Sequence, residues 1–210
     1  MYWTYGQSIV ITVSYDRHNN NNMESESNNA IVNGHQEQDI QNIKHPLERK
    51  WSYWMYTDKS SVWEKNLVKL TTFDTVEDFW CLYHHMKLPT ELKVGQDYMV
   101  FKDGITPMWE NEANKKGGRW IIGFEKKTFK EMDRIWLGVI LLMIGENFMH
   151  PDLVCGALVN VRAKSKICLW TRSVDEKQNC EVARKIKNRL GLYSRLHFYM
   201  HESKTSLYSV

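Results

Sequence analysis

Cysteine is scarce in this sequence, and none of its four cysteines forms a C-x-x-C pair. The four are Cys81, Cys155, Cys168 and Cys180, and each sits in an apolar or helical run. This pattern does not resemble a disulfide framework. It predicts free thiols and a reducing compartment.

Long hydrophobic runs are also missing. The longest, from Ile135 to Ile144, has about half the length that a membrane span needs, so it predicts a core helix. Near the N-terminus, the apolar run Ile9–Val13 is too short for a secretory signal, and no basic segment precedes it. We therefore expect a protein without membrane contact, located in the cytoplasm with a nuclear pool as the alternative.

Catalytic motifs are absent as well. The sequence contains no G-x-x-x-x-G-K-[ST], H-E-x-x-H or G-x-S-x-G. His84 and His85 are adjacent in a predicted helix, where neighbouring side chains point about 100° apart, so they cannot hold one metal together. No nucleophile lies next to a base in any recognisable pattern. We expect a protein that is not an enzyme and that needs neither a cofactor nor a metal.

The charge is divided unevenly along the chain. Lys and Arg number 28 against 25 Asp and Glu, a net charge of +3, yet residues 1–44 hold five acids and only two bases. That segment contains the run Asn19–Asn22 and many further polar residues, so we expect a disordered N-terminal tail over 1–44. Within this tail, only the run Ile9–Val13 has a high β-propensity. The remaining domain, 45–210, is mildly basic, which suits an anionic ligand.

Hydrophobic periodicity predicts a mixed α+β domain. Strands are expected at 51–56, 67–73, 97–101, 120–124, 155–164, 166–173 and 196–200, and helices at about 76–87, 130–145 and 175–190. Asp74 and Thr75 supply capping residues for the first helix, and Gly191 ends the third. Strands broken by three separated helices favour an antiparallel sheet that is covered on one face.

Two tryptophans lie in charged surroundings that are unusual for core residues. Trp109 follows a turn that contains Pro107 and precedes Glu110, and Trp63 stands next to Glu64. An indole face beside a carboxylate suits a planar, electron-poor ligand whose edge donates hydrogen bonds. The alternative is that these tryptophans are structural, as large aromatic residues usually are.

A basic turn offers a candidate anion site. Arg162, Lys164 and Lys166 surround a predicted hairpin turn, and Trp170 lies further along the second strand. Asn160, Arg162 and Lys164 are expected on one face of the first strand, a cluster that suits a diphosphate or triphosphate. The alternative is a solvated basic turn. Arg119, which follows two glycines, is a second and weaker basic point.

Two predicted helices carry spare apolar stripes. Val76 and Trp80 are neighbours at i, i+4 on the first helix, and Leu137 and Leu141 are off the main stripe of the second. Together they predict one exposed patch that receives a partner helix. A wider buried stripe is the alternative.

Five sequence motifs identify a known family. They are His45-Pro46-Leu47, Phe73-Asp74-Thr75-Val76-Glu77-Asp78-Phe79-Trp80, Pro107-Met108-Trp109-Glu110, Gly117-Gly118-Arg119-Trp120 and Asn160-Val161-Arg162-Ala163-Lys164. Over residues 45–200 the chain resembles the translation initiation factor 4E family, which binds the 5′ cap of messenger RNA. The resemblance implies a curved antiparallel sheet of about eight strands with three helices on its convex face.

The resemblance also implies roles for individual residues. Trp63 and Trp109 are expected to sandwich 7-methylguanine, Glu110 to accept its N1–H and N2–H, and Trp170 to touch the N7-methyl group. The implied phosphate ligands are Arg162 and Lys166, with help from Arg119 and Lys164. The implied partner site comprises His45, Pro46, Val76, Trp80, Leu137, Gly138 and Leu141, and it takes a helix of initiation factor 4G or of 4E-binding repressors.

The chain departs from the family pattern at three places. Gly138 stands where an acidic residue usually faces the partner, and a glycine within a helix costs about 1 kcal/mol relative to alanine. The turn after Ala163 is one residue shorter than usual, which blurs the assignment of Lys164 and Lys166. The segment Met200–Val210 is about ten residues short of the family's C-terminal loop.

The sequence therefore predicts a monomeric cap-binding factor that recruits initiation factor 4G under the control of 4E-binding repressors. One alternative is a cap-binding competitor that recruits 4G weakly. Another is a generic aromatic platform for single-stranded RNA.

Overall fold

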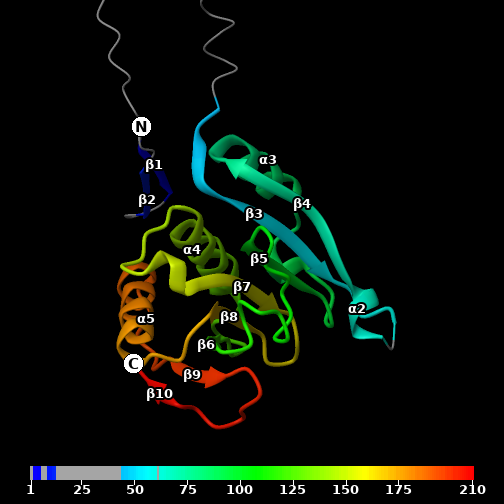
Figure 1. Ribbon diagram of the computed structural model, residues 1–210. Helices are drawn as coiled ribbons and strands as arrows, with labels where there is room; N and C mark the ends of the chain where they lie inside the picture. Colours follow the sequence, from blue (N-terminus) through cyan, green and yellow to red (C-terminus); the bar gives the residue numbers. More distant parts are fainter. Residues whose placement is uncertain (1, 6–8, 13–43, 61) are drawn as a thin grey trace, which may run out of the picture.

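The computed structural model describes residues 2–5, 9–12, 44–60 and 62–210. Near the N-terminus, strands β1 (Tyr2–Tyr5) and β2 (Ile9–Thr12) pair antiparallel, so the β-prone run forms a strand. Of the tail predicted to be disordered over 1–44, residues 1, 6–8 and 13–43 lie outside the described part of the chain. The remaining described chain forms a sheet with helices packed against it (Figure 1).

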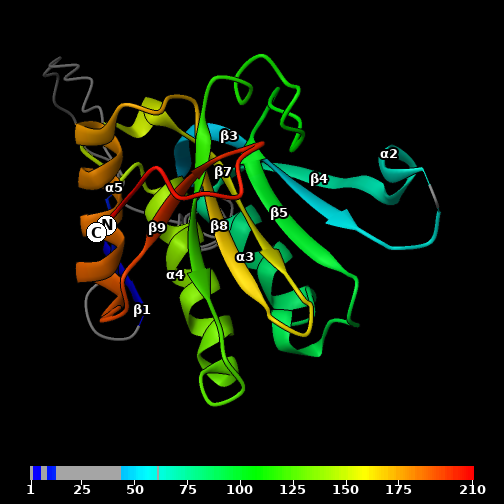
Figure 2. The same cartoon turned by 90° about the horizontal axis from the view of Figure 1, so that it is seen from below.

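Eight antiparallel strands form the main sheet, in the order β10-β9-β6-β8-β7-β5-β3-β4. Their bounds are β3 (Pro46–Tyr56), β4 (Leu67–Thr75), β5 (Asp97–Lys102), β6 (Gly118–Gly123), β7 (Val154–Asn160), β8 (Lys166–Thr171), β9 (His197–Met200) and β10 (Tyr208–Ser209). Figure 2 shows that the strands bend along their length, so the sheet is curved. The predicted curved antiparallel sheet of eight strands is confirmed.

Three long helices accompany the sheet: α3 (Val76–His85), α4 (Met132–Ile144) and α5 (Glu176–Leu190). A fourth, α2 (Trp63–Asn66), has a single turn and lies between β3 and β4. Short 3₁₀ turns occupy Pro89–Glu91, Phe129–Glu131 and Pro151–Leu153. The three predicted helices are confirmed, with their ends shifted by a few residues.

The helix ends follow from local chemistry. The Thr75 hydroxyl accepts the backbone N–H of Asp78 at 3.2 Å, which satisfies a donor that the first turn of α3 leaves unpaired. The Asp175 carboxylate accepts from Gln178 at 2.8 Å and begins α5 in the same way. Gly191 ends α5 with a φ of 67°, a left-handed conformation that glycine adopts without steric cost.

The two faces of the sheet carry different apolar clusters. Trp51 and Tyr53 join the large core shared with α3, α4 and α5, as their alternation predicts. Trp54 and Tyr56 point to the opposite face, where a smaller cluster includes Phe101. Its buried members are Tyr56, Met99, Phe101, Cys155, Leu158, Cys168 and Trp170. This smaller cluster lies on the side of the sheet opposite the three long helices.

The four cysteines are all free, as predicted. Cys81 is exposed and the other three are buried. Burial raises the pKa of the Cys168 thiol to about 11, so this group stays protonated and packs as a small apolar side chain.

Candidate functional site

A cavity of about 480 Å³ opens on the face of the sheet away from the helices. Its lining includes Trp109, Glu110, Arg162 and Trp170, four residues from three separate segments of the chain. Asp97 from β5 contributes to the wall as well. The cavity thus combines an indole surface, carboxylates and a guanidinium, which suits a planar ligand that carries an anionic extension.

The aromatic lining differs in burial from one residue to the next. Trp109 lies in the loop between β5 and β6 and is 46 % exposed, although it is a large apolar side chain. Trp170 lies in β8 and is buried, with its ring edge-to-face on Phe101 at 5.4 Å and 87°. Trp63 begins α2, and its side chain lies outside the described part of the structure. Its place opposite Trp109 stays a prediction.

Two exposed carboxylates line the cavity. Glu110 follows Trp109 in the loop between β5 and β6, and Glu64 follows Trp63 in α2. A carboxylate accepts hydrogen bonds and also favours a cation next to it. These two carboxylates therefore favour a cationic group next to them in the cavity.

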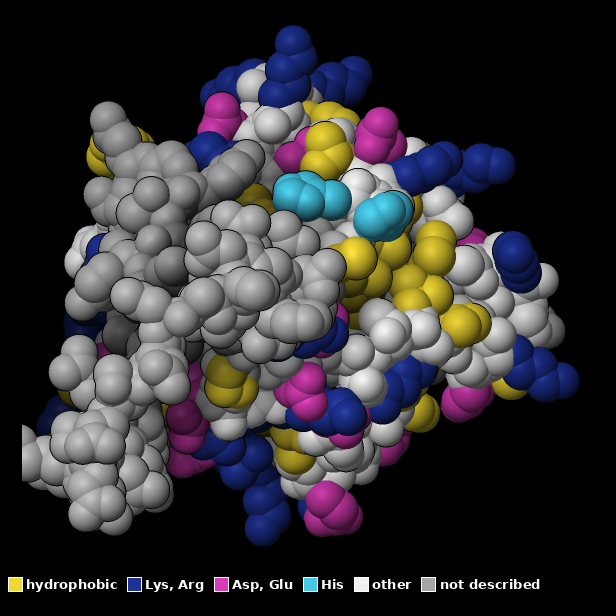
Figure 3. All heavy atoms as spheres, turned by 90° about the horizontal axis from the view of Figure 1, so that it is seen from above, with side chains coloured by type: hydrophobic (Ala, Val, Ile, Leu, Met, Phe, Trp, Pro, Cys, Tyr) yellow, Lys and Arg dark blue, Asp and Glu magenta, His cyan; other side chains and the backbone are white. Residues whose placement is uncertain are grey.

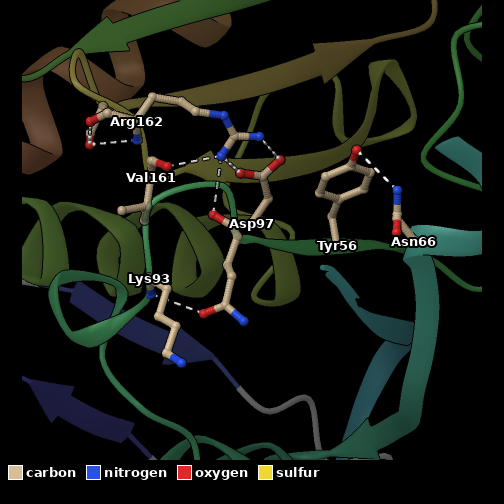
Figure 4. Close-up of polar contacts among 8 residues, drawn as sticks. Tyr56, Asn66, Lys93, Asp97, Val161 and Arg162 are labelled. Carbon is tan, nitrogen blue, oxygen red and sulfur yellow. Dashed lines mark hydrogen bonds and ion pairs between the residues drawn. The ribbon is translucent and has the colours of Figure 1, made fainter. Parts of the chain in front are cut away.

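The guanidinium of Arg162 is fixed by a buried acid (Figure 4). Its Nη1 donates to Asp97 Oδ1 at 2.6 Å and its Nη2 donates to Asp97 Oδ2 at 3.2 Å. Nη1 also donates to the carbonyl of Val161 at 2.9 Å. Burial raises the pKa of Asp97 despite the opposing effect of Arg162. Nε takes part in none of these bonds, so the fork holds Arg162 in place with donor capacity left for a ligand.

The basic turn differs in part from the prediction. Strand β7 ends at Asn160, and residues 162–164 form a turn, because the hydroxyl of Ser165 donates to the Arg162 carbonyl at 2.9 Å and accepts its N–H at 3.2 Å. The predicted strand over 155–164 is therefore too long: Asn160 and Arg162 both line the cavity, as expected of a shared face, but Lys164 does not. Lys166 begins β8 opposite Asn160, and Lys164 is exposed in the turn. Neither lysine lines the cavity.

Arg119 donates hydrogen bonds to backbone carbonyls at and just after the end of β9. It lies in β6 directly across from Trp170, and its Nη1 donates to the carbonyls of Met200 at 3.0 Å and His201 at 2.7 Å. Of the four predicted phosphate ligands, Arg162 is thus the one that lines the cavity. The roles of Arg119, Lys164 and Lys166 toward a ligand stay predictions.

Sequence reasoning missed two residues of this region. Asp97 begins β5 opposite Asn160 and pairs with Arg162, 65 positions away, so no local sequence pattern points to it. His201 packs on Trp170 with ring centroids 4.2 Å apart, and both of its ring nitrogens are buried without a hydrogen-bond partner in the described part of the chain. Burial and the nearby Arg119 lower the pKa of His201 to about 4.

The predicted partner site lies on the opposite side of the sheet. Val76, Gly138, Leu137 and Leu141 are buried, with Leu137 and Leu141 only 3 % and 2 % exposed, and β2 lies against α4. The alternative of a wider buried stripe therefore holds for these two leucines. Figure 3 views the molecule from the end at which α3 lies in Figure 1, and it shows hydrophobic side chains gathered beside histidines there.

Trp80 is the half-exposed member of this surface, and its ring stacks on His84 at 5.6 Å and 29°. Pro46 is exposed, while His45 is half-buried because its backbone N–H and its Nδ1 both contact the Glu77 carboxylate, at 2.8 Å and 2.6 Å. These contacts tie the start of β3 to the first turn of α3. The binding of a partner helix here stays a prediction.

Of the residues that the structure describes, none belongs to a helix long and apolar enough to cross a membrane. The same described residues hold no group of three or more His, Cys, Asp or Glu side chains arranged to bind a metal ion.

Comparison with known proteins gives one consistent family. The family model described as eukaryotic initiation factor 4E matches residues 46–209. The chain is similar to eukaryotic translation initiation factor 4E of Xenopus laevis, with 49 % identity over 161 residues that cover 74 % of this chain and 76 % of that protein. It is also similar to the Homo sapiens protein of that name, with 50 % identity over 155 residues and 71 % of each chain covered.

Solved structures agree in fold. Initiation factor 4E-3 of Ascaris suum, crystallised with an m7G cap, matches with a TM-score of 0.77 and 37 % identity, covering 80 % of this chain and 98 % of that one. The factor 4E-3 of C. elegans, in complex with the 4E-binding protein Mextli and a cap analog, matches with a TM-score of 0.75 and 35 % identity, covering 80 % and 100 %.

Proposed function

Because the chain belongs to the eukaryotic initiation factor 4E family, we propose that it binds the 7-methylguanosine 5′ cap of messenger RNA. The observation that carries this proposal is the cavity that brings Trp109, Glu110, Arg162 and Trp170 together on one face of the sheet. Structures of relatives with 31–37 % identity hold cap compounds, as their descriptions state.

The base is recognised by charge and by its hydrogen-bonding edge. Methylation at N7 gives guanine a delocalised positive charge, and an indole face attracts such a cation by roughly 2 kcal/mol when water is excluded. Trp109 supplies one face and Trp63 the other. Glu110 accepts the N1–H and N2–H donors, a charge-assisted contact that contributes on the order of 1–3 kcal/mol of base discrimination. Trp170, at the floor, contacts the methyl group.

The phosphates are bound at the other end of the cavity. Arg162, fixed by Asp97, presents its remaining N–H groups to the phosphate chain. Lys166 and Lys164 on the adjoining turn, together with Arg119, add positive charge. These contacts do not depend on the base and weaken as the salt concentration rises.

The protein acts by binding and not by catalysis. It functions as a monomer in the cytoplasm, with a nuclear pool as the alternative, and it needs no cofactor. Its protein partners are initiation factor 4G and 4E-binding repressors, which place a helix on the surface around His45, Pro46 and Trp80. Complexes of relatives with Mextli and with a 4E-binding protein support this assignment.

A second candidate function differs in its output. In this version the protein binds caps but recruits 4G weakly, so it competes with other cap-binding factors. The observation that favours it is the buried Gly138, flanked by the buried Leu137 and Leu141, where the family pattern places an acid that faces the partner. If the chain binds 4G and repressor peptides as tightly as other members of the family do, this candidate is removed.

Paired titrations test the proposed function. Tryptophan fluorescence is measured while 7-methyl-GTP or unmethylated GTP is added to the full chain. We expect strong quenching and at least a tenfold tighter affinity for the methylated nucleotide, because GTP lacks the positive charge on its base. Equal affinities would favour the generic aromatic RNA platform, and no binding of either nucleotide would remove the proposal.

A further inference from the structure

A buried asparagine fastens the loop that carries Trp63. Asn66, which is 1 % exposed, lies at the end of this loop between β3 and β4. Its Oδ1 accepts the backbone N–H groups of Lys59 at 2.9 Å and Ser60 at 2.8 Å. Its Nδ2 donates to the Ser60 carbonyl at 2.6 Å. It also donates to the Tyr56 hydroxyl at 3.4 Å, a bond drawn in Figure 4. One amide therefore binds the loop to itself and to the floor of the sheet.

A second buried asparagine fastens the loop that carries Trp109 and Glu110. Asn114 is fully buried, and its Nδ2 donates to the carbonyls of Thr106 at 3.0 Å and Met108 at 2.8 Å. These carbonyls lie on the segment that leads directly into Trp109. The loop has no strand partner over this stretch, so the amide supplies hydrogen bonds that a sheet would otherwise provide.

We propose that Asn66 and Asn114 are positioning residues for cap binding, each holding one of the two tryptophan loops in its binding conformation. The inference rests on the proposed function, since it assigns the cap base to the space between these loops. Neither asparagine lines the cavity, so each acts through the loop and not through contact with the ligand.

The chemistry of the amide explains why asparagine stands at both positions. Asn66 must accept from two N–H groups and donate to a carbonyl, which requires both ends of an amide. Asn114 must donate twice to carbonyls. The network allows one orientation of each amide, because the flipped form would place Oδ1 against carbonyl oxygens. Buried polar groups of a loop are costly when unpaired, so these bonds hold the loop in one conformation.

The expected effect follows from preorganisation. When a loop adopts its binding conformation for only a fraction of the time, the apparent affinity falls by that fraction. Removing either amide leaves the loop backbone without its partners, so we expect the affinity for 7-methyl-GTP to fall about tenfold or more. The association rate constant should fall with it, because fewer molecules are ready to bind. The binding stoichiometry should not change.

Charge substitutions separate the two positions. In Asn66→Asp the carboxylate still accepts from Lys59 and Ser60, so two of the bonds survive. In Asn114→Asp the carboxylate faces two carbonyl oxygens and keeps neither bond. The loss of cap affinity should therefore be larger for Asn114→Asp than for Asn66→Asp.

The chain offers a matched control in Asn179. It is also fully buried, and its Nδ2 also donates to two carbonyls, of Ser173 at 2.8 Å and Asp175 at 2.9 Å. These residues lie at the start of α5, and none of them lines the cavity. Asn179→Ala should reduce the free energy of unfolding like the other two alanine substitutions while cap affinity stays within about twofold of wild type.

The experiment measures thermal unfolding and stopped-flow binding of 7-methyl-GTP for the full chain and for Asn66→Ala, Asn114→Ala and Asn179→Ala, at a temperature where each is folded. Amide hydrogen exchange at Lys59 and Ser60 reports the first loop directly and should accelerate in Asn66→Ala. Wild-type affinity in both loop variants would overturn the proposal. So would an equal loss in Asn179→Ala, which would indicate a general loss of stability. Failure of the wild-type chain to bind would instead contradict the proposed function.

If an alanine variant does not fold, the aspartate pair decides the matter. The proposal then requires the predicted order of affinities, with Asn114→Asp weaker than Asn66→Asp. The reverse order, or equal affinities, would overturn it.

Discussion

Replacing Trp109 with alanine separates binding from stability. Trp109 is 46 % exposed and belongs to neither apolar cluster, so its removal creates no cavity in the core. Substitutions of this kind usually change the free energy of unfolding by no more than about 0.5 kcal/mol. We therefore expect Trp109→Ala to unfold at nearly the wild-type temperature.

Its effect on binding should be large. Stacking of a base on an aromatic ring contributes about 1–3 kcal/mol, and the cation–π attraction adds roughly 2 kcal/mol for a methylated base. Some of this energy is retained because the second indole and the carboxylate remain. A loss of about 3 kcal/mol corresponds to roughly 100-fold weaker binding of 7-methyl-GTP. Unmethylated GTP loses only the stacking part, so the preference for methylation should shrink.

The assay pairs calorimetric titration of both nucleotides with thermal unfolding. Trp170→Ala serves as the contrast, because Trp170 is 8 % exposed and packs on Phe101, so its removal should destabilise the fold by about 3–5 kcal/mol. Binding of 7-methyl-GTP by Trp109→Ala within about threefold of wild type would refute the reasoning, since the indole would then contribute less than about 1 kcal/mol.

Three further changes test other parts of the account. Glu110→Gln should weaken 7-methyl-GTP binding about 10- to 100-fold without affecting unfolding, because the charge-assisted contact is lost from an exposed side chain; unchanged affinity in the same titration would contradict this. His201→Phe should remove part of the acid sensitivity of the fold: the pKa of His201 is lowered from 6.5 to about 4, so the unfolded chain takes up the proton first and stability falls as the pH drops through that range. Between about pH 7 and 4.5, the free energy of unfolding measured in urea should fall by about 1–2 kcal/mol more for the wild-type chain than for His201→Phe. Equal losses in the two proteins would contradict this prediction. Trp80→Ala should abolish binding of a 4E-binding peptide in a pull-down while cap-resin retention persists; loss of both would show that Trp80 supports the core.

Much of the fold was predictable from local patterns. The period of two in β3 puts Trp51 and Tyr53 on one face and Tyr56 on the other, and Thr75 and Gly191 marked helix ends through capping chemistry. Such features depend on near neighbours in the chain, which a single sequence displays. The order of the eight strands depends on distant pairings, which local patterns do not show, and the family resemblance implied only the approximate number of strands and the curvature.

The site was predictable in its residue types and less so in its contacts. Trp109 and Glu110 stood out because their neighbours are polar, and the structure places both at the cavity. The Asp97 partner of Arg162 joins residues 65 positions apart, and no local pattern indicates it. The strand predicted over 155–164 ends at Asn160, four residues early, because Ser165 and Arg162 hydrogen-bond across a turn. The burial of Leu137 depends on what packs over α4, which a helical stripe alone does not specify.

A crystal structure of the chain with a 7-methylguanosine cap analogue tests the central claim most directly. The account predicts that the methylated base lies between the indoles of Trp63 and Trp109, with its N1–H and N2–H donated to Glu110. A base located anywhere else on the molecule, or one that stacks on neither indole, would contradict it.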